Sequence, residues 1–303
     1  MVAIVSAFES LIGRFNNRRS RDSLRGYVWL APSLLGVAAF YIIPFFIIVY
    51  YSMIDNPIHG NFVFLDNFIS LINNRAFRTA AQNTFSFSAM AVPLAVVLSL
   101  LIALMLEARI PLKSQFRTFF LSPMMVPVAS IVLIWQVLFH PNGAVNELLI
   151  ILGWAGIDWM QSEHNQLVVV ILFLWKNLGF NMILFMAALS NIPREQLETA
   201  EVEGAGAFQK FFSIKLRYLS PTLLFVTIFS LINSFRIFRE VYLLTGDYPY
   251  AGLYLIQHFM NNIFRMLDYQ RLAAAAVLMA IVMVIIIATL FIAEHRFGKD
   301  VEE

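Results

Sequence analysis

The sequence predicts an all-α integral membrane protein with six transmembrane helices, and three observations support this fold class. The chain of 303 residues is 60% hydrophobic and 13% charged, whereas a soluble domain is usually about half apolar and about one-quarter charged. Six apolar runs are each close to the roughly 20 residues that a helix needs to cross the hydrocarbon layer. The polar connections alternate between lysine- and arginine-rich and lysine- and arginine-poor segments.

The six predicted spans cover about residues 27–53, 85–106, 119–139, 167–189, 222–244 and 272–293. Prolines lie inside or at the start of the first three runs. We interpret them as kinks, because neighbouring helices can satisfy the carbonyl groups that a proline leaves free. Residues 26–303 are therefore predicted to form one membrane domain.

Residues 1–25 precede that domain and differ from it in pattern. Apolar residues recur at helical spacing as far as Phe15, and several arginines follow, up to Arg25. A secretory signal would place its basic residues before the apolar run and end in a small-residue cleavage site. We expect instead an amphipathic helix on the cytoplasmic leaflet, followed by a basic anchor.

The distribution of basic residues predicts the orientation of the chain. Most of the 21 lysines and arginines lie in the N-terminal arm, the connection after the second span, the connection at residues 190–221 and the C-terminal tail. Cytoplasmic connections carry this excess in membrane proteins. Both termini and the loop at residues 190–221 are therefore predicted to be cytoplasmic, in a plasma or inner cell membrane.

Between residues 139 and 166 lies a shorter apolar segment with Trp154 and Trp159. Its apolar part, residues 148–152, is too short to span a membrane. Tryptophan is enriched at the membrane–water boundary, so we predict an interfacial segment. A lid over the translocation path is the alternative.

Polar and basic side chains lie in the fourth and fifth runs. A charge in mid-membrane is costly, and such residues usually face a bundle interior or a watery cavity. Amide and hydroxyl groups suit a polyhydroxylated ligand. For each polar residue taken alone, the alternative is hydrogen bonding between helices. For Arg239 and Glu240, the alternative is that they snorkel or pair with each other near the outer face. The candidate substrate-pathway residues are Lys176, Asn177, Asn181, Ser230, Asn233, Ser234, Arg236 and Ile237.

Several classes of function lack their motifs in this sequence. There is no phosphate-binding loop of the G-x-x-x-x-G-K-[ST] type, and no hydrolase motif of the H-E-x-x-H or G-x-S-x-G type. The chain has no cysteine, and its five histidines are scattered. The net charge of +2 does not argue for nucleic acid. We expect a protein that is not an enzyme and holds no cofactor, so that energy for uphill transport would come from a partner.

The loop at residues 190–221 is the most patterned polar connection. It begins with Pro193 and four glutamates, is interrupted by Gly204 and Gly206, and continues with phenylalanines and basic residues. Proline and acidic residues favour a helix start. The loop therefore predicts a helix, a bend and a second helix, which together offer a docking surface between two membrane spans.

This loop resembles the EAA motif of ABC importer permeases. The matching residues are Glu198-Thr199-Ala200, Gly204-Ala205, Phe211, Ile214, Leu216 and Pro221. Thr199 stands where the family has its first alanine, and Arg217 where it has proline. The resemblance implies that the loop couples to an ATPase through Glu195, Glu198, Thr199, Ala200, Glu203, Gly204, Ala205 and Phe208.

Nearly the whole chain is similar to sugar permeases of the maltose/glycerol-phosphate type. The similar segments include Tyr41-Ile42-Ile43-Pro44, Asn83-Thr84, Gly143-Ala144-Val145-Asn146, Trp175-Lys176-Asn177 and Leu243-Leu244-Thr245-Gly246. Asp247-Tyr248-Pro249 departs from the family's Gly-Pro at that place. The resemblance implies a type I importer fold and adds Phe180 to the sugar pocket.

The same resemblance implies a set of partners. These are a second permease, which we expect to be a different chain, two ATPase subunits that bind ATP and Mg²⁺, and an extracytoplasmic binding protein that delivers the sugar. The basic residues near the pocket leave an acidic or phosphorylated substrate open. A secondary transporter or channel without an ATPase is the alternative, and it predicts inverted repeats and titratable residues in mid-membrane.

Overall fold

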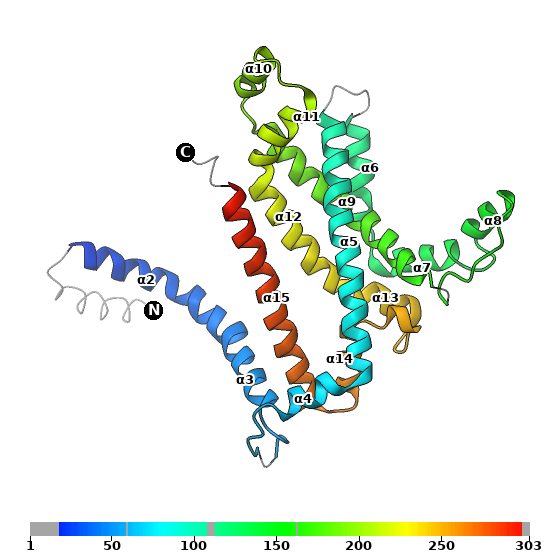
Figure 1. Ribbon diagram of the computed structural model, residues 1–303. Helices are drawn as coiled ribbons and strands as arrows, with labels where there is room; N and C mark the ends of the chain where they lie inside the picture. The colour runs from blue at the N-terminus through cyan, green and yellow to red at the C-terminus, as the bar shows by residue number, and fades with distance from the viewer. Residues whose placement is uncertain (1–17, 59, 108–112, 162, 299–303) are drawn as a thin grey trace.

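The computed structural model describes residues 18–58, 60–107, 113–161 and 163–298, which form a bundle of helices (Figure 1). Five helical runs are long and apolar enough to cross a membrane: 29–52, 75–107, 165–190, 207–245 and 269–296. A bent pair of helices, at 113–125 and 128–138, makes the number six if the pair counts as one span. The prediction of an all-α protein with six spans is confirmed on this count.

The first span consists of α2 (Arg18–Val37), a π-helical turn (Ala38–Ile42) and α3 (Ile43–Ser52). Pro44 lies in the first turn of α3, where its missing N–H is tolerated. α3 packs against α15 (Tyr269–Gly298), whereas α2 extends away from the bundle in Figure 1. An amphipathic helix is predicted for residues 1–25. Residues 1–17 lie outside the described residues, and residues 18–25 form the start of α2.

The third span is broken, unlike the single run predicted at residues 119–139. α6 (Lys113–Met125) and α7 (Val128–Leu138) meet at an angle of 101°. Pro127 caps α7 with an extended ψ of 138°. Proline lacks a backbone donor and disfavours the helical conformation at the residue before it, which favours a break at this place.

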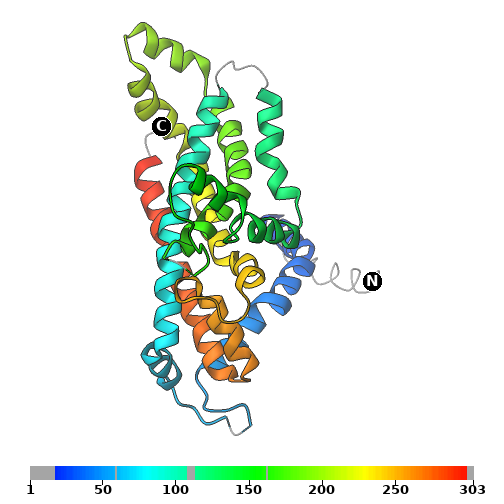
Figure 2. The ribbon, with the colours of Figure 1, turned by 90° about the vertical axis from the view of Figure 1, so that its right-hand side faces the viewer.

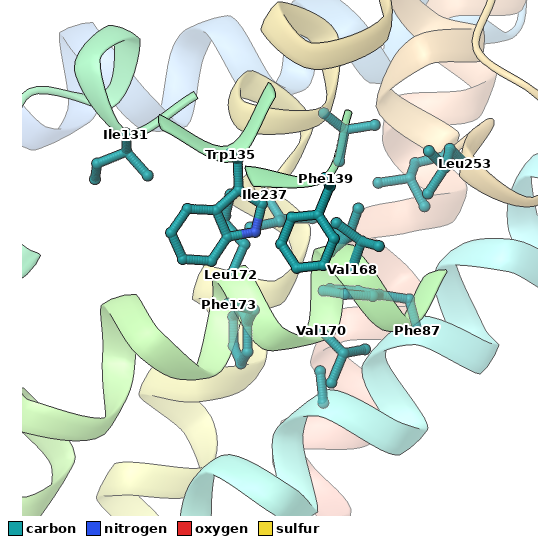
Figure 3. Close-up of a cluster of buried hydrophobic side chains, with 14 of the residues drawn as sticks. Phe87, Ile131, Trp135, Phe139, Val168, Val170, Leu172, Phe173, Ile237 and Leu253 are labelled. Carbon is teal, nitrogen blue, oxygen red and sulfur yellow. The ribbon is translucent and has the colours of Figure 1, made fainter. Parts of the chain in front are cut away.

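α9 (Asn165–Ser190) lies at the centre of the bundle. It packs against α5 (Arg75–Glu107), α6 and α12 (Leu216–Arg236). Its N-terminal half supports a buried cluster in which Trp135 of α7 and Phe139, the residue that follows α7, lie over Val168 and Phe173 of α9 (Figure 3). The Phe173 ring meets Phe87 of α5 edge-on, with the ring centroids 5.7 Å apart. This cluster holds the bent α7 against the central helix.

The polar connections gather at opposite ends of the bundle, as two perpendicular views show (Figures 1 and 2). α10 (Arg194–Val202) and α11 (Ala207–Lys210) lie at one end, and α4 (Asp66–Asn73) and α14 (Ile256–Arg265) lie at the other. The fifth span continues from α11 through a π-helical turn (Phe211–Lys215) into α12 and then α13 (Phe238–Thr245). The loop at residues 190–221 is thus separated by the length of the bundle from the connections that contain α4 and α14.

The segment between residues 139 and 166 forms the short helix α8 (Ala144–Ile151) and an irregular return. The side-chain oxygen of Asn146 accepts hydrogen bonds from Ile157 N–H, at 3.1 Å, and from Trp159 Nε1, at 3.0 Å. Trp154 is exposed, as an interfacial segment requires, but Trp159 packs against the buried cluster instead. Its indole therefore helps to fix the return of the chain through the hydrogen bond to Asn146.

Gly179 allows α6 and α9 to touch, and its replacement tests that contact. A Cβ atom at Gly179 would lie 1.9 Å from the carbonyl oxygen of Phe120, which is backbone and cannot rotate away. We expect Gly179→Ala to destabilise the purified protein by about 1–3 kcal/mol, the usual cost of overpacking. Thermal unfolding in detergent measures the loss. Gly36→Ala is the matched control because nothing lies within 4 Å of the place that its Cβ atom would take, and an equal Tm for both variants would contradict this packing.

His258, at the end of the bundle that contains α4 and α14, is predicted to make the stability of the protein depend on pH. Its side chain is fully buried on α14, where Nδ1 accepts a hydrogen bond from Leu255 N–H at 3.3 Å and the ring contacts Phe238. Burial lowers the pKa of His258 to about 4, although the charge of Asp247 acts in the opposite direction. The unfolded chain, with the ordinary histidine pKa of about 6.5, therefore binds a proton that the folded protein does not.

The free energy of unfolding should accordingly fall as the pH decreases from about 6.5 to about 4. We expect His258→Gln to remove this part of the pH dependence, so that the Tm difference between wild type and variant changes across that range. Thermal unfolding in detergent at a series of pH values measures it, with His295→Gln at an exposed position as the control. A Tm difference independent of pH would show that His258 is not buried as a neutral ring.

Candidate functional site

A polar cavity of ≈ 500 Å³ lies between α9, α12 and α13. Most of the candidate pathway residues line it: Lys176, Asn177, Phe180, Asn233, Arg236 and Ile237. Helical spacing explains their convergence, because Phe229, Asn233 and Arg236 follow one face of α12, and Lys176 lies near the middle of α9. The cavity is therefore placed within the membrane-spanning part of the bundle.

Two asparagines join the walls of this cavity. Asn233 Nδ2 donates a hydrogen bond to Asn177 Oδ1 at 2.9 Å, and Asn177 Nδ2 donates to the backbone oxygen of Phe173 at 2.8 Å. Both amides are thus oriented by α9 itself. An amide held in this way presents its remaining hydrogen-bonding groups in a fixed direction, as recognition of a hydroxylated ligand requires.

The other three candidate pathway residues do not line this cavity. Asn181 Nδ2 donates to Ser230 Oγ at 2.9 Å, and the Ser234 hydroxyl lies 2.9 Å from that of Ser88 on α5. All four side chains are buried between helices. Their geometry is that of hydrogen bonds between transmembrane helices, which was the alternative for each of them.

Lys176 and Glu240 form an ion pair at the cavity. The side chain of Glu240 is only 3% exposed, so the ion pair with Lys176 is largely withdrawn from solvent on the Glu240 side. Pairing of Glu240 with its neighbour Arg239 was one of the alternatives, and the structure pairs Glu240 with Lys176 instead, because adjacent helical residues point in different directions. The sequence did not reveal the correct pair, whose members lie on different helices and 64 residues apart.

Aromatic rings form another part of the wall. The rings of Phe180 and Phe229 lie with centroids 4.7 Å apart and their planes inclined by 41°. Phe229, Met124, Phe238, Arg239, Glu240 and Gln257 also line the cavity and were not among the candidate pathway residues. Phe229 could have been predicted from the sequence, since it precedes Asn233 by one helical turn. Gln257 could not be predicted in this way, because it reaches the cavity from α14, outside the fourth and fifth spans.

The loop at residues 190–221 forms the predicted helix, bend and helix. Gly204 has a left-handed φ of +84°, and around it Ala205 N–H donates to Ala200 C=O at 2.8 Å. A glycine at this position ends α10 without the steric cost that a Cβ atom would bring. Lys210 on α11 pairs with Glu201 on α10 at 3.0 Å, which links the two helices.

The candidate coupling residues lie on one exposed unit at the end of the bundle. Glu195, Glu198, Thr199 and Ala200 belong to α10, Glu203, Gly204 and Ala205 to the bend, and Phe208 to α11. No residue of α10 is buried, and the side chain of Phe208 is 82% exposed. Val202 is 90% exposed beside them and was not among the candidates. Large exposed apolar side chains of this kind mark interaction sites.

The loop and the cavity are separate but share a helical run. The run from Ala207 to Thr245 contains Phe208 at one end and the cavity residues Asn233 and Arg236 toward the other. Lys215 within this run pairs with Glu107 at the end of α5, at 2.6 Å. Within the described residues, no group of three or more histidines or carboxylates is placed to hold a metal ion.

Comparison with known proteins gives one family and several relatives. Residues 83–301 match the model of the binding-protein-dependent transport system inner membrane component. The "Trehalose/maltose transport system permease protein" of Thermococcus litoralis is 29% identical, covering 92% of this chain and 96% of its own. The "Arabinooligosaccharides transport system permease protein" of Bacillus subtilis is 30% identical, covering 72% of this chain and 71% of its own.

A solved structure shows the same fold. A chain in the crystal structure of the "bacterial alginate ABC transporter in complex with alginate pentasaccharide-bound periplasmic protein" superposes with a TM-score of 0.79, at 21% identity. The match covers 92% of this chain and 96% of that one. Fold, family model and relatives agree with the predicted resemblance, and the chain belongs to the family of inner membrane components of binding-protein-dependent transport systems.

Proposed function

We propose that this chain is a permease subunit of an ATP-driven importer that translocates a sugar or oligosaccharide delivered by an extracytoplasmic binding protein. The observation that carries the proposal is the helical run from Ala207 to Thr245, which joins the exposed loop to the polar cavity. The names of the relatives, which are permeases of trehalose/maltose and arabinooligosaccharide systems, support the substrate class.

In this proposal the cavity is the solute pocket. Asn177 and Asn233 supply oriented amides for hydroxyl groups, and Phe180 with Phe229 supplies ring faces for the apolar faces of a sugar. The pocket is small enough to enclose only part of a long oligosaccharide. Passage would therefore proceed with a few sugar units inside the pocket at a time.

The coupling unit is α10 with α11, which we propose to dock into a cytoplasmic ATPase subunit. ATP-driven closure of two such ATPases would move this unit and tilt α12 against α9, exposing the cavity alternately to each side. ATP and Mg²⁺ would be bound by the ATPases. Both chain termini face the cytoplasm in this arrangement, as the basic residues predict.

A second permease completes the proposed assembly, and we expect it to be a different chain. The most apolar part of the first span is not buried within this chain, which leaves that surface for lipid or for the second permease. A secondary transporter remains the alternative function, but it has no need of a docking unit with large exposed apolar side chains such as Val202 and Phe208. The exposed unit therefore favours the importer.

Replacing Glu198 or Gly204 tests the coupling unit. Glu198→Ala removes an exposed carboxylate, and Gly204→Ala forces a Cβ into a left-handed conformation at a cost of about 1–2 kcal/mol. We expect each variant to reduce solute uptake by about tenfold or more, within the usual range of coupling energies. Uptake into cells expressing the complete transporter measures this, with membrane levels checked by immunoblot.

Glu147→Ala is the matched control, because it removes an exposed glutamate from a short helix away from the loop, α8. It should leave uptake unchanged. Normal uptake in both coupling variants would contradict the proposal that the loop couples to an ATPase. Purification of the chain without any ATPase, together with solute transport in the absence of ATP, would favour a secondary transporter instead.

A further inference from the structure

We propose that the transported saccharide is anionic and carries a carboxylate, phosphate or sulfonate group that binds between Arg236 and Arg239. The proposal rests on the proposed function, because it names the substrate class of the same cavity. Its basis is an excess of positive charge on the cavity wall. A neutral sugar does not compensate that excess.

The charges of the cavity do not balance. Lys176, Arg236 and Arg239 line it together with Glu240, which is the one carboxylate among the described lining residues. Glu240 is already paired with Lys176. Within the described parts of the chain, neither arginine forms a salt bridge. Two guanidinium groups therefore remain without a counter-ion in one polar cavity.

The two arginines are placed to act on one ligand group. Arg236 is the last residue of α12 and Arg239 the second residue of α13, so they lie about one helical turn apart. Both side chains are exposed to the cavity rather than packed in the core. Guanidinium groups bind carboxylate and phosphate through paired N–H donors, which gives both strength and orientation.

Because these charges lie within the membrane-spanning part of the bundle, binding of a counter-ion is energetically favourable. A cation within a membrane-spanning segment carries a large solvation penalty unless it is paired or faces water. Lys176 meets that requirement through Glu240, whereas the arginines face the cavity and would gain a partner when an anion binds. An empty cavity is then electrostatically attractive to an anionic solute. The amides of Asn177 and Asn233 remain for its hydroxyl groups.

The substrate experiment uses the complete transporter with its binding protein, reconstituted in liposomes. ATPase stimulation is measured with a pool of neutral oligosaccharides and with three anionic pools: oligouronates, sugar phosphates and sulfonated sugars. We expect at least one anionic pool to stimulate and the neutral pool not to do so. Stimulation by the neutral pool alone overturns this inference but not the proposed function. Stimulation by no pool contradicts the proposed function itself.

The residue experiment uses Arg236→Gln and Arg239→Gln with the anionic saccharide that stimulates. Each variant should raise its half-saturating concentration by about tenfold to hundredfold, the range expected for a lost charge-assisted contact. Arg→Lys at the same positions should recover part of the affinity, since charge is kept without the planar fork. Arg271→Gln, an exposed arginine of α15 paired with Asp268, is the matched control.

A second role for the arginines predicts a different result. If they pair with a carboxylate of the other permease, Arg236→Gln and Arg239→Gln should reduce the amount of assembled transporter and leave the half-saturating concentration unchanged. That outcome overturns the inference. Gel filtration of the purified complex, performed on the same preparations, separates loss of assembly from loss of affinity.

Discussion

The contact between α9 and α12 depends on pairing polar groups inside an apolar bundle. In a hydrocarbon surrounding, an amide or hydroxyl without a partner costs several kcal/mol, so polar side chains seek partners on neighbouring helices. Asn177 meets Asn233, and Asn181 meets Ser230. These two hydrogen bonds fix the rotation of both helices about their axes. The cavity exists because Phe180 and Phe229 are then brought to the same side of the contact.

The arrangement separates two kinds of polar residue that look alike in sequence. Buried pairs such as Asn181 with Ser230 hold helices together, whereas Asn177 and Asn233 combine that role with exposure to a cavity. Gly179 also contributes to the position of α9, because it lets the backbone of α6 approach the other side of this helix. α9 is thus fixed by close packing on one side and by hydrogen bonds on the other.

The sequence was sufficient for the helices and for the exposed loop, because hydropathy, basic residues and glycine act locally. The break at Pro127 was harder, since a proline in an apolar run produces either a kink or a complete turn and tertiary packing decides between them. The Lys176–Glu240 pair was beyond local reasoning, because it depends on how α13 turns back toward α9. The same limit applies to Gln257, which reaches the cavity from another element.

The run of helix from α11 into α12 has a mechanical consequence. Phe208 and Asn233 are 25 residues apart along it, which at 1.5 Å per residue is about 40 Å. A body of that length acts as a lever arm, and a tilt of about 10° about one end moves the other by about 7 Å. A displacement of that size is comparable with the width of a sugar ring. In the proposed transport cycle, the length of the helix alone would convert a modest rotation at the loop into a change of width at the cavity.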